Sequence, residues 1–416
     1  MRAHSLLVLT MVACRSSVAG PAQVRPGIEV LLSDSIHLIT GKRLALLTNQ
    51  TGVDRAGRRD VDLLRDAGAQ PPAAFALVAL FSPEHGLRGQ EDRSGLPDAI
   101  DSATGLPIYS LYSGSRPPNY AALDSVDILL VDLQDIGARY YTYPPTAVLL
   151  MREAARRGKR VLVLDRPNPV GGAAVQGNVR ARLGPLDGGG LDFLPLPMRH
   201  GMTLGEILNL ANDVYQLQAD LTVVPALGWR RDLYFDATGL PWVRPSPNMP
   251  DLESAFHYPG TCLFEATNLS VGRGTGFAFQ VVGAPWLDAA AVLSWMRETG
   301  NGTRNALAGV DVAVDSFTPR GPTDGKYDGV PLRGLRLRVT DRFRYDPTRM
   351  AVALLAAIHA VHPDSLRIRP ERFDQLAGGP DLRVAILAGR APAEIRRSWD
   401  TALDAFRRTR GKYLLY

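Results

Sequence analysis

The sequence is poor in cysteine, and this scarcity excludes two kinds of structural support. Its 416 residues contain only Cys14 and Cys262, and its seven histidines are dispersed. A structural zinc site needs cysteines or histidines at short, regular spacing, so we expect no metal. We expect Cys14 to be removed or modified during maturation, which leaves Cys262 without a partner for an intramolecular disulfide. A lone cysteine of this kind is usually a small buried hydrophobic residue.

The sequence also lacks a run of charge of one sign and a nucleotide-binding motif. Positive and negative residues are interleaved along the chain, and the formal net charge is +5. Nucleic-acid-binding proteins gather their basic residues in a stripe, so this distribution argues against a nucleic-acid partner. No glycine-rich fingerprint follows the first predicted strand, and Gly272-Arg273-Gly274-Thr275-Gly276 has no P-loop lysine. We therefore expect no nucleotide and no other cofactor.

The first 20 residues have the pattern of an export signal. Arg2 and His4 precede an apolar run at 6–13, which is too short to span a membrane. Met11-Val12-Ala13-Cys14 resembles a lipobox, in which the cysteine becomes the lipidated first residue, and cleavage after Ser17-Val18-Ala19 is the alternative. Both alternatives predict a protein exported to the periplasm or cell envelope. A membrane contact would then depend on a lipid anchor at Cys14.

The first half of the remaining sequence alternates short apolar segments with amphipathic ones. Nearly continuous apolar strands are typical of a parallel sheet that is covered by helices on both faces. The pattern therefore predicts an α/β domain with a Rossmann-like parallel sheet. The predicted strands are 43–48, 77–81, 127–132, 160–164 and 221–224, and the predicted helices are 60–67, 146–157 and 203–215.

The pattern changes after about residue 228. Four prolines between 241 and 250 prevent regular structure there, and a strand-like segment at 334–340 and helices at 347–361 and 393–408 follow. A chain of 416 residues also exceeds the usual size of one domain. We expect a signal peptide at 1–20, a Rossmann-like domain at 24–230, and a second, smaller α+β domain at 231–416.

Polar residues follow four of the predicted strands at the point where each strand ends. Ligands of open parallel sheets bind just beyond the carboxyl ends of the strands. Four consecutive ends rich in amides, carboxylates and arginine favour a binding cleft over chance loop chemistry. These ends are Thr48-Asn49-Gln50, Ser82-Pro83-Glu84-His85-Gly86, Asp132-Leu133-Gln134-Asp135-Ile136-Gly137-Ala138-Arg139-Tyr140-Tyr141, and Asp165-Arg166-Pro167-Asn168-Pro169.

Glu84 is the clearest catalytic candidate at these strand ends. Pro83 fixes the backbone before it and Gly86 permits a sharp turn after it, so the carboxylate can be held in place. A carboxyl group in a partly apolar cleft can act as a general acid, and His85 can orient it or bind substrate. The alternative is that Glu84 only caps a turn.

Aromatic and arginine side chains near these loops suggest a sugar ligand that carries an acid. Sugar rings stack on aromatic faces, and Tyr109, Tyr112, Tyr140, Tyr141, Tyr143, Trp229 and Trp242 lie in or beside the loops. Arginine binds carboxylates in a bidentate manner, and the candidates are Arg139, Arg166, Arg199 and Arg273. The alternatives are core packing for the aromatic residues and structural ion pairs for the arginines.

A series of long motifs from about Val24 to Tyr416 resembles the NamZ-type exo-β-N-acetylmuramidase family. The motifs before residue 200 are Leu47-Thr48-Asn49-Gln50-Thr51-Gly52, Phe81-Ser82-Pro83-Glu84-His85-Gly86, Asp132 to Tyr143, and Leu164-Asp165-Arg166-Pro167-Asn168-Pro169. The later motifs are Arg199-His200-Gly201-Met202-Thr203, Pro245-Ser246-Pro247-Asn248-Met249-Pro250, Tyr258-Pro259-Gly260-Thr261, Thr267-Asn268-Leu269-Ser270 and Tyr413-Leu414-Leu415-Tyr416.

The resemblance implies an active site in the cleft between the Rossmann-like domain and the auxiliary domain. It also implies a glycosidase that removes terminal β-1,4-linked N-acetylmuramic acid from the non-reducing end of peptidoglycan fragments, with Glu84 as acid/base. The catalytic candidates are Glu84, His85 and Asp135. The candidate substrate-binding residues are Asn49, Gln50, Gln134, Arg139, Tyr140, Tyr141, Arg166, Asn168, Arg199, His200, Asn248, Asn268 and Arg273.

Two aspects of the chemistry stay open in the sequence. A second carboxylate can come from Asp135, Asp132, Glu91 or Glu265, and participation by the acetamide of the substrate is the alternative. The chain also departs from the family pattern, because Ala266 replaces a glycine and Val271 a glutamate. These departures, with the lipobox-like start, leave a second hypothesis: a non-catalytic surface lipoprotein that binds muropeptides or amino sugars.

Overall fold

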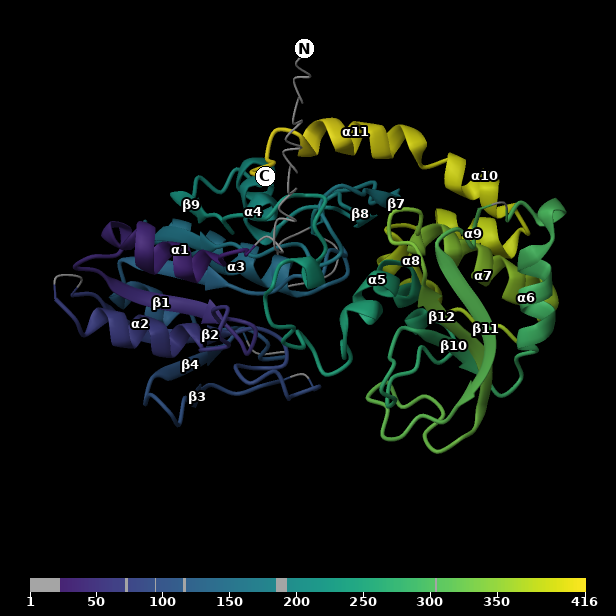
Figure 1. Ribbon diagram of the computed structural model, residues 1–416, viewed down its shortest axis with the longest axis horizontal. Coiled ribbons are helices and arrows are strands. Elements are labelled where there is room, and N and C mark those ends of the chain that lie inside the picture. The colour runs from purple at the N-terminus through teal and green to yellow at the C-terminus, as the bar shows by residue number, and fades with distance from the viewer. Residues whose placement is uncertain (1–22, 72–73, 94, 115–116, 185–192, 304) are drawn as a thin grey trace, which may run out of the picture.

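A computed structural model describes residues 23–71, 74–93, 95–114, 117–184, 193–303 and 305–416. These residues form two lobes, an N-terminal domain and an auxiliary domain (Figure 1). The predicted signal peptide and Cys14 lie outside the described residues. No helix within the described part of the chain is long and apolar enough to cross a membrane.

The N-terminal domain is built on a seven-stranded sheet in the order β3-β4-β2-β1-β5-β6-β9. All neighbouring strands are parallel except β3 and β4, which pair in antiparallel orientation at one edge. The predicted Rossmann-like parallel sheet is therefore confirmed. The strands are β1 (Arg43–Thr48), β2 (Ala76–Ser82), β3 (Ala99–Ile100), β4 (Pro107–Ser110), β5 (Ile128–Asp132), β6 (Arg160–Leu164) and β9 (Leu221–Val224).

Helices cover both faces of this sheet, which explains why its strands are apolar throughout. On one face, Leu44 and Leu46 of β1 pack with α1 (Gly27–Asp34) and α2 (Asp60–Gly68). On the other face, Ala45 and Leu47 pack with α3 (Tyr143–Arg156) and α4 (Leu204–Val214). Alternate residues of one strand thus enter two separate cores, and each needs an apolar side chain.

The auxiliary domain has a three-stranded antiparallel sheet in the order β10-β12-β11. Its central helix α7 (Pro347–Val361) begins at a cap from Asp346 and is buried over most of its length. The predicted closing helix at 393–408 is wrong as a single element, because a turn at Ser398 and Trp399 divides it. The remaining elements are β10 (Val281–Ala284), β11 (Val310–Phe317), β12 (Leu332–Val339), α5 (Leu252–Thr261), α6 (Ala289–Arg297), α8 (Pro370–Ala377), α9 (Asp381–Leu387), α10 (Pro392–Arg397) and α11 (Asp400–Arg410).

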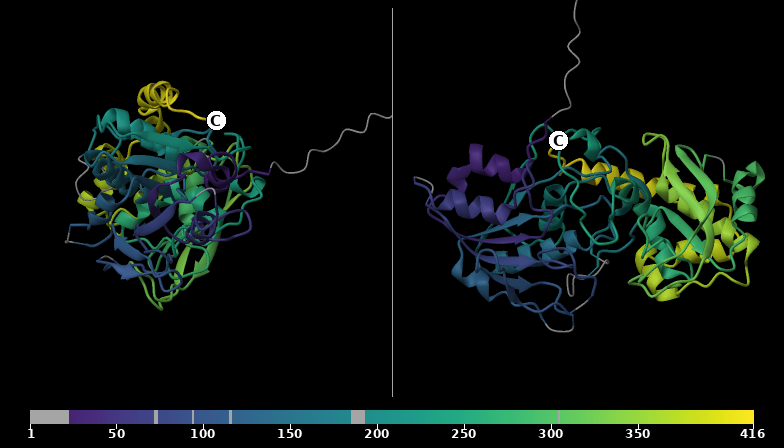
Figure 2. Two further views of the ribbon diagram at one scale, coloured as in Figure 1. Left: turned by 90° about the vertical axis from the view of Figure 1, so that its left-hand side faces the viewer. Right: turned by 60° about the horizontal axis from the view of Figure 1, so that its bottom comes forward.

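Three segments of the described chain lie at the junction of the two domains or pass between them. A hairpin of β7 (Gln176–Val179) and β8 (Pro197–Arg199) lies at the junction, and a proline-rich segment at 241–250 leads into α5. Helix α11 then returns from the auxiliary domain to the N-terminal domain (Figures 1 and 2). Beyond it, the hydroxyl of Tyr416 donates to Asp165 Oδ2 at 2.8 Å and accepts from the amide of Ala226 at 2.9 Å. These connections hold the two domains face to face.

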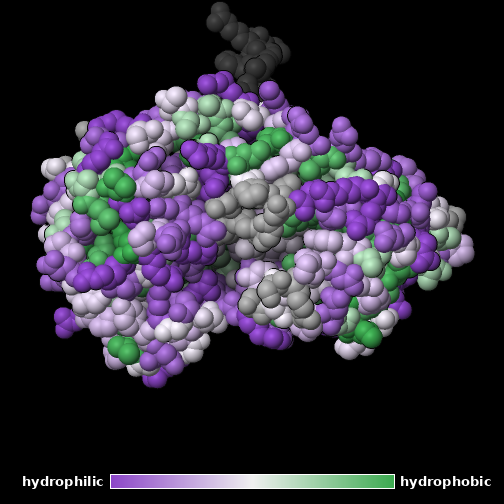
Figure 3. Space-filling view, turned by 180° about the vertical axis from the view of Figure 1, so that it is seen from behind, coloured by the Kyte–Doolittle hydropathy of each residue, from purple (hydrophilic) through white to green (hydrophobic). Residues whose placement is uncertain are grey.

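The outer surface is mixed in character. On the face shown in Figure 3, hydrophilic residues cover most of both lobes and hydrophobic residues form only small, scattered groups. This distribution agrees with the interleaved charges of the sequence. A cavity of about 950 Å³ lies beside α1 and is lined by charged residues that pair with one another, among them Arg25 with Asp34 and Arg58 with Asp54. Glu84 and the other candidate site residues do not line it, so it is not our candidate site.

Candidate active site

Glu84 lies in a tight loop, residues 83–92, that follows β2 and that we call the Glu84 loop. His85 and Gly86 both have positive φ, +70° and +71°, so the chain reverses direction immediately after the glutamate. A left-handed conformation is unusual for a histidine, and strained residues of this kind concentrate at functional sites. The ring of His85 is held in place because its Nδ1 lies 2.7 Å from the carbonyl oxygen of Glu91. The loop therefore holds Glu84 in a defined position.

Two hydroxyl groups hold the carboxylate of Glu84. Thr142, at the start of α3, donates its hydroxyl to Glu84 Oε2 at 2.5 Å. Tyr112, which follows β4, lies on another side: burial raises the pKa of its hydroxyl to about 12, and the charge of Glu84 adds to this shift. Glu84 itself is only half-buried. Its carboxyl group is thus oriented by the protein while remaining accessible.

Polar side chains around Tyr143, near this carboxylate, include buried atoms without a hydrogen bond. Within the described part of the chain, Asn49 Nδ2, Gln50 Oε1 and the hydroxyl of Tyr141 are buried and lack a hydrogen bond. Asn49 and Gln50 adjoin Tyr143, and burial together with the charge of Glu84 raises the pKa of both Tyr141 and Tyr143. Buried polar groups are normally hydrogen-bonded, so an unpaired set suggests a polar ligand. These side chains can donate to and accept from sugar hydroxyl groups.

Gly89 allows the Glu84 loop to close over Gln50. Its φ is +67°, and a Cβ atom at this position would lie 2.0 Å from the side-chain amide carbon of Gln50. The same amide donates to the carbonyl oxygens of Arg244 and Pro245 at 2.8 and 3.2 Å. Gln50 therefore connects the end of β1 to the proline-rich segment that enters the auxiliary domain.

The auxiliary domain forms the opposite wall of the site. Asn248 donates to Asp92 Oδ2 at 2.7 Å, and Arg273 lies 3.7 Å from the same oxygen. Arg273 also pairs with Glu265 at 2.6 Å, while His85 Nδ1 lies 3.6 Å from Asp92. Burial alone would raise the pKa of Asp92, but hydrogen bonds from Thr323 and Asn248 and the charge of Arg273 hold it below its usual value. Asp92 is therefore an anion that joins the Glu84 loop to Arg273 and Glu265.

Several other candidates are used by the protein itself at the ends of β5 and β6. Arg166 forms an ion pair with Asp132, donates to the carbonyl of Val53 at 2.9 Å, and lies 3.8 Å from Asp60. All three charged residues are buried. Asp60 has a pKa well above its usual value, mainly because of burial and then because of the charge of Asp132. This group, which we call the buried triad (Asp60, Asp132 and Arg166), joins the ends of β5 and β6 to the start of α2.

Two more arginines hold backbone carbonyl groups. Arg139 donates to the carbonyls of Asn178, Leu196 and Leu376 at 2.7, 3.1 and 2.8 Å, which ties the N-terminal domain to α8. Arg199 is buried and donates to Gln176 and to the carbonyl of Val170. The structure gives both a clear structural role, which is the alternative that the sequence had left open.

Asp135 lies deeper than Glu84 and forms local contacts. Its Oδ2 accepts from the amide of Gly137 at 2.8 Å and lies 3.3 Å from His200 Nε2, while its Oδ1 has no partner among the described residues. His200 accepts from the amide of Met202 through Nδ1, so the proton of the neutral ring faces Asp135. Gln134 donates to the carbonyl of Pro167 at 2.9 Å. These residues shape the floor of the site.

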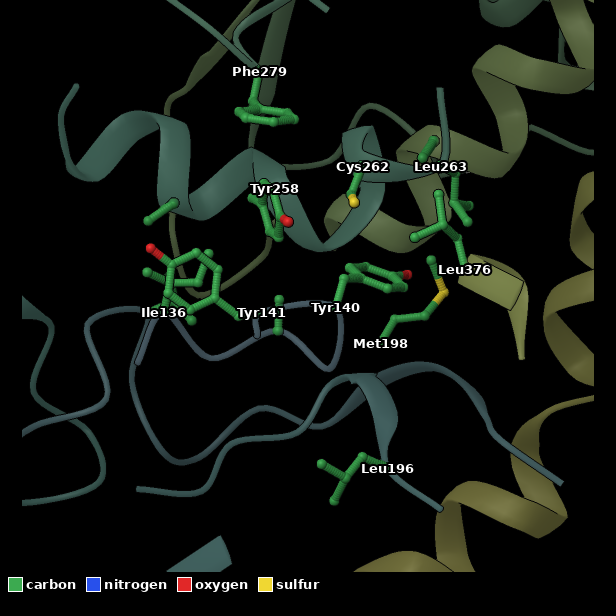
Figure 4. Close-up of a cluster of buried hydrophobic side chains, with 14 of the residues drawn as sticks. Ile136, Tyr140, Tyr141, Leu196, Met198, Tyr258, Cys262, Leu263, Phe279 and Leu376 are labelled. Atoms are coloured by element: carbon green, nitrogen blue, oxygen red, sulfur yellow. The ribbon is translucent and has the colours of Figure 1, made fainter. Parts of the chain in front are cut away.

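The remaining predicted residues also make structural contacts. Asn168 donates to the carbonyl of Met202 at 2.9 Å, and Asn268 donates to that of Ser365 at 2.9 Å. Tyr140 donates to the carbonyl of Pro259 at 3.2 Å and packs on Tyr258 in the cluster where the two domains meet (Figure 4). The two tryptophans pack in the same manner, Trp229 against Tyr416 and Trp242 against Phe235.

Structure adds residues that the sequence did not single out. Thr142 stands inside a motif of the resemblance but gave no sign of contacting Glu84. Asp92 and Thr323 lie in none of the motifs of the resemblance. Val271, the main departure from the family pattern, is fully buried beside Phe279, whose amide donates to its carbonyl at 2.6 Å. Its apolar side chain therefore belongs to the core.

Metal ligands are not clustered at this site. Across the residues that the structure describes, no group of three or more histidines, cysteines, aspartates and glutamates is placed to hold an ion. The arrangement offers instead one accessible carboxyl group, several neutral hydrogen-bonding groups, and a paired set of charges on the opposite wall. This combination suits acid–base chemistry on a polar, uncharged bond such as a glycosidic linkage.

Known proteins resemble the chain along nearly its whole length. Residues 44–253 match the family model described as exo-beta-N-acetylmuramidase NamZ, N-terminal, and residues 256–416 match its C-terminal counterpart. A Bacillus subtilis (strain 168) protein named peptidoglycan beta-N-acetylmuramidase NamZ is 39% identical over 404 residues, which cover 97% of this chain and 94% of the relative.

Two crystal structures of DUF1343 family proteins from Bacteroides fragilis NCTC 9343 are also similar. Their TM-scores are 0.82 and 0.74, and their sequence identities are 33% and 32%. Each comparison covers 95% of this chain and 99% of the solved one.

Proposed function

The chain belongs to the NamZ family of exo-β-N-acetylmuramidases, and we propose that it hydrolyses peptidoglycan fragments to release their terminal β-1,4-linked N-acetylmuramic acid. The observation that carries this proposal is the placement of Glu84. Its carboxyl group is oriented by Thr142 and Tyr112 and lies among unpartnered polar groups. Fragments are attacked from the non-reducing end, and the fragments themselves are the only partner that the proposal requires.

Glu84 serves as the general acid in this proposal. It donates a proton to the bridging oxygen as the bond to the anomeric carbon breaks and an oxocarbenium-like state develops. The hydroxyl of Thr142 keeps the carboxyl group in one orientation during this step. Asn49, Gln50 and Tyr141 bind the hydroxyl and acetamide groups of the terminal sugar.

A second acidic group completes a two-carboxylate mechanism. Asp132 and Asp135 are buried and engaged in local contacts, and Glu91 is exposed and paired with Arg93. Glu265 faces the Glu84 loop from the auxiliary domain through Arg273 and Asp92. We therefore favour Glu265 as the second carboxylate, with Asp135 positioning His200. Participation by the substrate acetamide is the alternative, and retention of configuration together with an active Glu265→Gln variant would favour it.

Replacement of the acid tests the central assignment. Glu84→Gln keeps the shape and the hydrogen bond from Thr142 but cannot donate the proton. We expect kcat on a chromogenic N-acetylmuramide to fall by roughly 10²- to 10⁴-fold, with an unchanged unfolding midpoint. Glu91→Gln, an exposed change in the same loop, is the matched control. Full activity of Glu84→Gln would refute the role of Glu84, and binding without turnover by the parent protein would favour the non-catalytic lipoprotein.

We propose in addition that the protein is exported to the periplasm or cell envelope. The support is the sequence of residues 1–20, with its positive start, short apolar run and lipobox-like Cys14. Incorporation of a labelled fatty acid into the parent protein and not into Cys14→Ser would identify a lipoprotein. Export without label would identify simple cleavage, and retention of the chain in the cytoplasm would contradict both.

A further inference from the structure

Muramic acid differs from glucosamine by a lactyl ether that carries a carboxylate, and the proposed function therefore requires a cation to recognise it. The arginines that the sequence suggested do not supply one. Arg139, Arg166 and Arg199 are buried and bind groups of the protein. Arg273 is already balanced by Glu265 at 2.6 Å and Asp92 at 3.7 Å.

Arg372 is a cation that no motif had indicated and that the fold brings to the junction of the domains. It is the third residue of α8, and its side chain is exposed. The start of α8 is tied to the 3₁₀ turn that carries Glu265, because the amide of Arg369 donates to the carbonyl of Ala266 at 2.8 Å. Helix α8 therefore lies directly behind the auxiliary wall of the site.

The position of Arg372 on its helix places it near the junction of the two domains. Residues four apart lie on the same face of a helix, so Arg372 shares a face with Leu376. Figure 4 shows Leu376 beside Cys262 and Met198, at the place where the two domains meet. Arg372 thus lies one turn before Leu376 on this face, nearer the start of α8, and its side chain is exposed.

The positive charge of Arg372 acts on groups in both domains. The positive charge of Arg372 acts on the hydroxyl of Tyr112 in the N-terminal domain and on the thiol of Cys262 in the auxiliary domain. Tyr112 is the residue that adjoins Glu84. Arg372 forms no ion pair within the described residues, and its hydrogen bond goes to the neutral Gln375 of its own helix at 2.6 Å. Its charge is therefore available to a ligand.

We infer that Arg372 binds the lactyl carboxylate of the terminal sugar and thereby selects muramic acid over glucosamine. An exposed arginine at the domain junction can form two parallel hydrogen bonds to a carboxylate, a geometry that lysine cannot provide. The main rival is Arg244, which is exposed on the proline-rich segment and whose carbonyl accepts from Gln50.

A cycle that changes both the enzyme and the substrate tests this assignment. The two substrates are a chromogenic N-acetylmuramide and the same compound with its lactyl carboxylate methylated, which keeps the size and removes the charge. The proteins are the parent, Arg372→Gln, Arg372→Lys and Arg244→Gln. Arg408→Gln, an exposed arginine of α11, is the matched control.

We expect the parent to prefer the acid to the ester by roughly 10- to 100-fold in kcat/KM, as for a charge-assisted hydrogen-bonded pair. Arg372→Gln should lose this preference while hydrolysing the ester as fast as the parent does. Arg372→Lys should keep part of it, and Arg408→Gln all of it. If Arg372→Gln kept the full preference, or if Arg244→Gln alone abolished it, the inference would be overturned.

The outcome is separable from the proposed function itself. A parent protein that released no sugar from either substrate would refute the hydrolase proposal. Calorimetric binding of free N-acetylmuramic acid and its methyl ester would then still test Arg372. Loss of the preference for the acid in Arg372→Gln would support recognition of the carboxylate, and an unchanged preference would refute it.

Discussion

The ends of β1 and β2 carry polar residues much like those at the ends of β5 and β6, yet the two pairs of strand ends are used differently. After β1 and β2, the carboxyl group of Glu84 is half-exposed, and Asn49 and Gln50 have buried side-chain atoms without a hydrogen bond among the described residues. After β5 and β6, Asp132 and Arg166 are buried against each other. The first pair of strand ends leaves polar groups free for a ligand, and the second pair uses its charged groups to stabilise the fold.

This difference follows from how the charged groups at each pair of strand ends are neutralised. A charged group that is buried needs an opposite charge or several hydrogen bonds, because its transfer from water costs several kcal/mol. The buried triad meets this need internally. Glu84 is half-exposed, so its carboxyl group keeps contact with water and needs no opposite charge from the protein. Similar sequence motifs therefore stabilise the fold at the ends of β5 and β6 and serve the proposed reaction at the ends of β1 and β2.

The largest expected effect is on stability, from the second pair of strand ends. Arg166→Met leaves Asp60 and Asp132 buried without a cation, and we expect the free energy of unfolding to fall by about 3–5 kcal/mol. Asp132→Asn should cost less, because Asp60 lies 3.8 Å from Arg166 and can become the counter-ion. Urea unfolding measures both. A stable Arg166→Met protein with a raised KM would show that Arg166 binds substrate instead.

A pH dependence of intermediate size is expected at Asp165, which follows β6. Burial raises its pKa to about 6, against opposing hydrogen bonds from Thr203, the amide of Gly205 and Tyr416. Below pH about 4 the group is protonated in the folded and unfolded chains, and its contribution to stability is complete. That contribution is lost as the pH rises through about 6, and the loss amounts to about 3 kcal/mol.

Asp165→Asn removes this titration and so isolates it. Between pH 4 and 7, the parent should lose about 3 kcal/mol of unfolding free energy relative to the variant. Urea titrations at several pH values measure the shift. A constant difference over this range would contradict the prediction.

The smallest expected effect is on catalysis, at the first pair of strand ends. Thr142→Val removes the hydroxyl that holds Glu84, and a hydrogen bond to a charged group contributes about 1.5–2 kcal/mol, or roughly 10- to 30-fold in kcat. Its unfolding midpoint should stay close to that of the parent. Thr222→Val, on the outer strand β9, is the control. Equal activity of the two variants would remove Thr142 from the site.

The sheet was predictable from sequence because its strands carry a physical signature. Each is buried on both faces, so the segments at 43–48, 77–81, 127–132 and 160–164 are almost wholly apolar. The turn after Glu84 was predictable as well, since a proline before it and a glycine two residues after it mark a fixed turn. The single helix expected at 393–408 was wrong because its charged surface pattern continues across the turn at Ser398 and Trp399.

The partners of Glu84 were not predictable, because they depend on tertiary contacts. Thr142 lies 58 residues from Glu84 in the sequence, and Asn248 lies 156 residues from Asp92. Arginines at 139, 166 and 199 look like ligands in sequence because a guanidinium that holds backbone carbonyls has the same local pattern as one that binds a substrate acid. Only the folded arrangement of the two domains separates these roles.

The return of the chain to the N-terminal domain also constrains the order in which the protein can be completed during synthesis. Tyr416 packs with Val24 and Trp229, and its hydroxyl bonds to Asp165 and Ala226. The N-terminal domain thus depends on a residue that is synthesised after the auxiliary domain. Until then Asp165 lacks one of its hydrogen bonds, and the first domain remains unfinished while the second is being made.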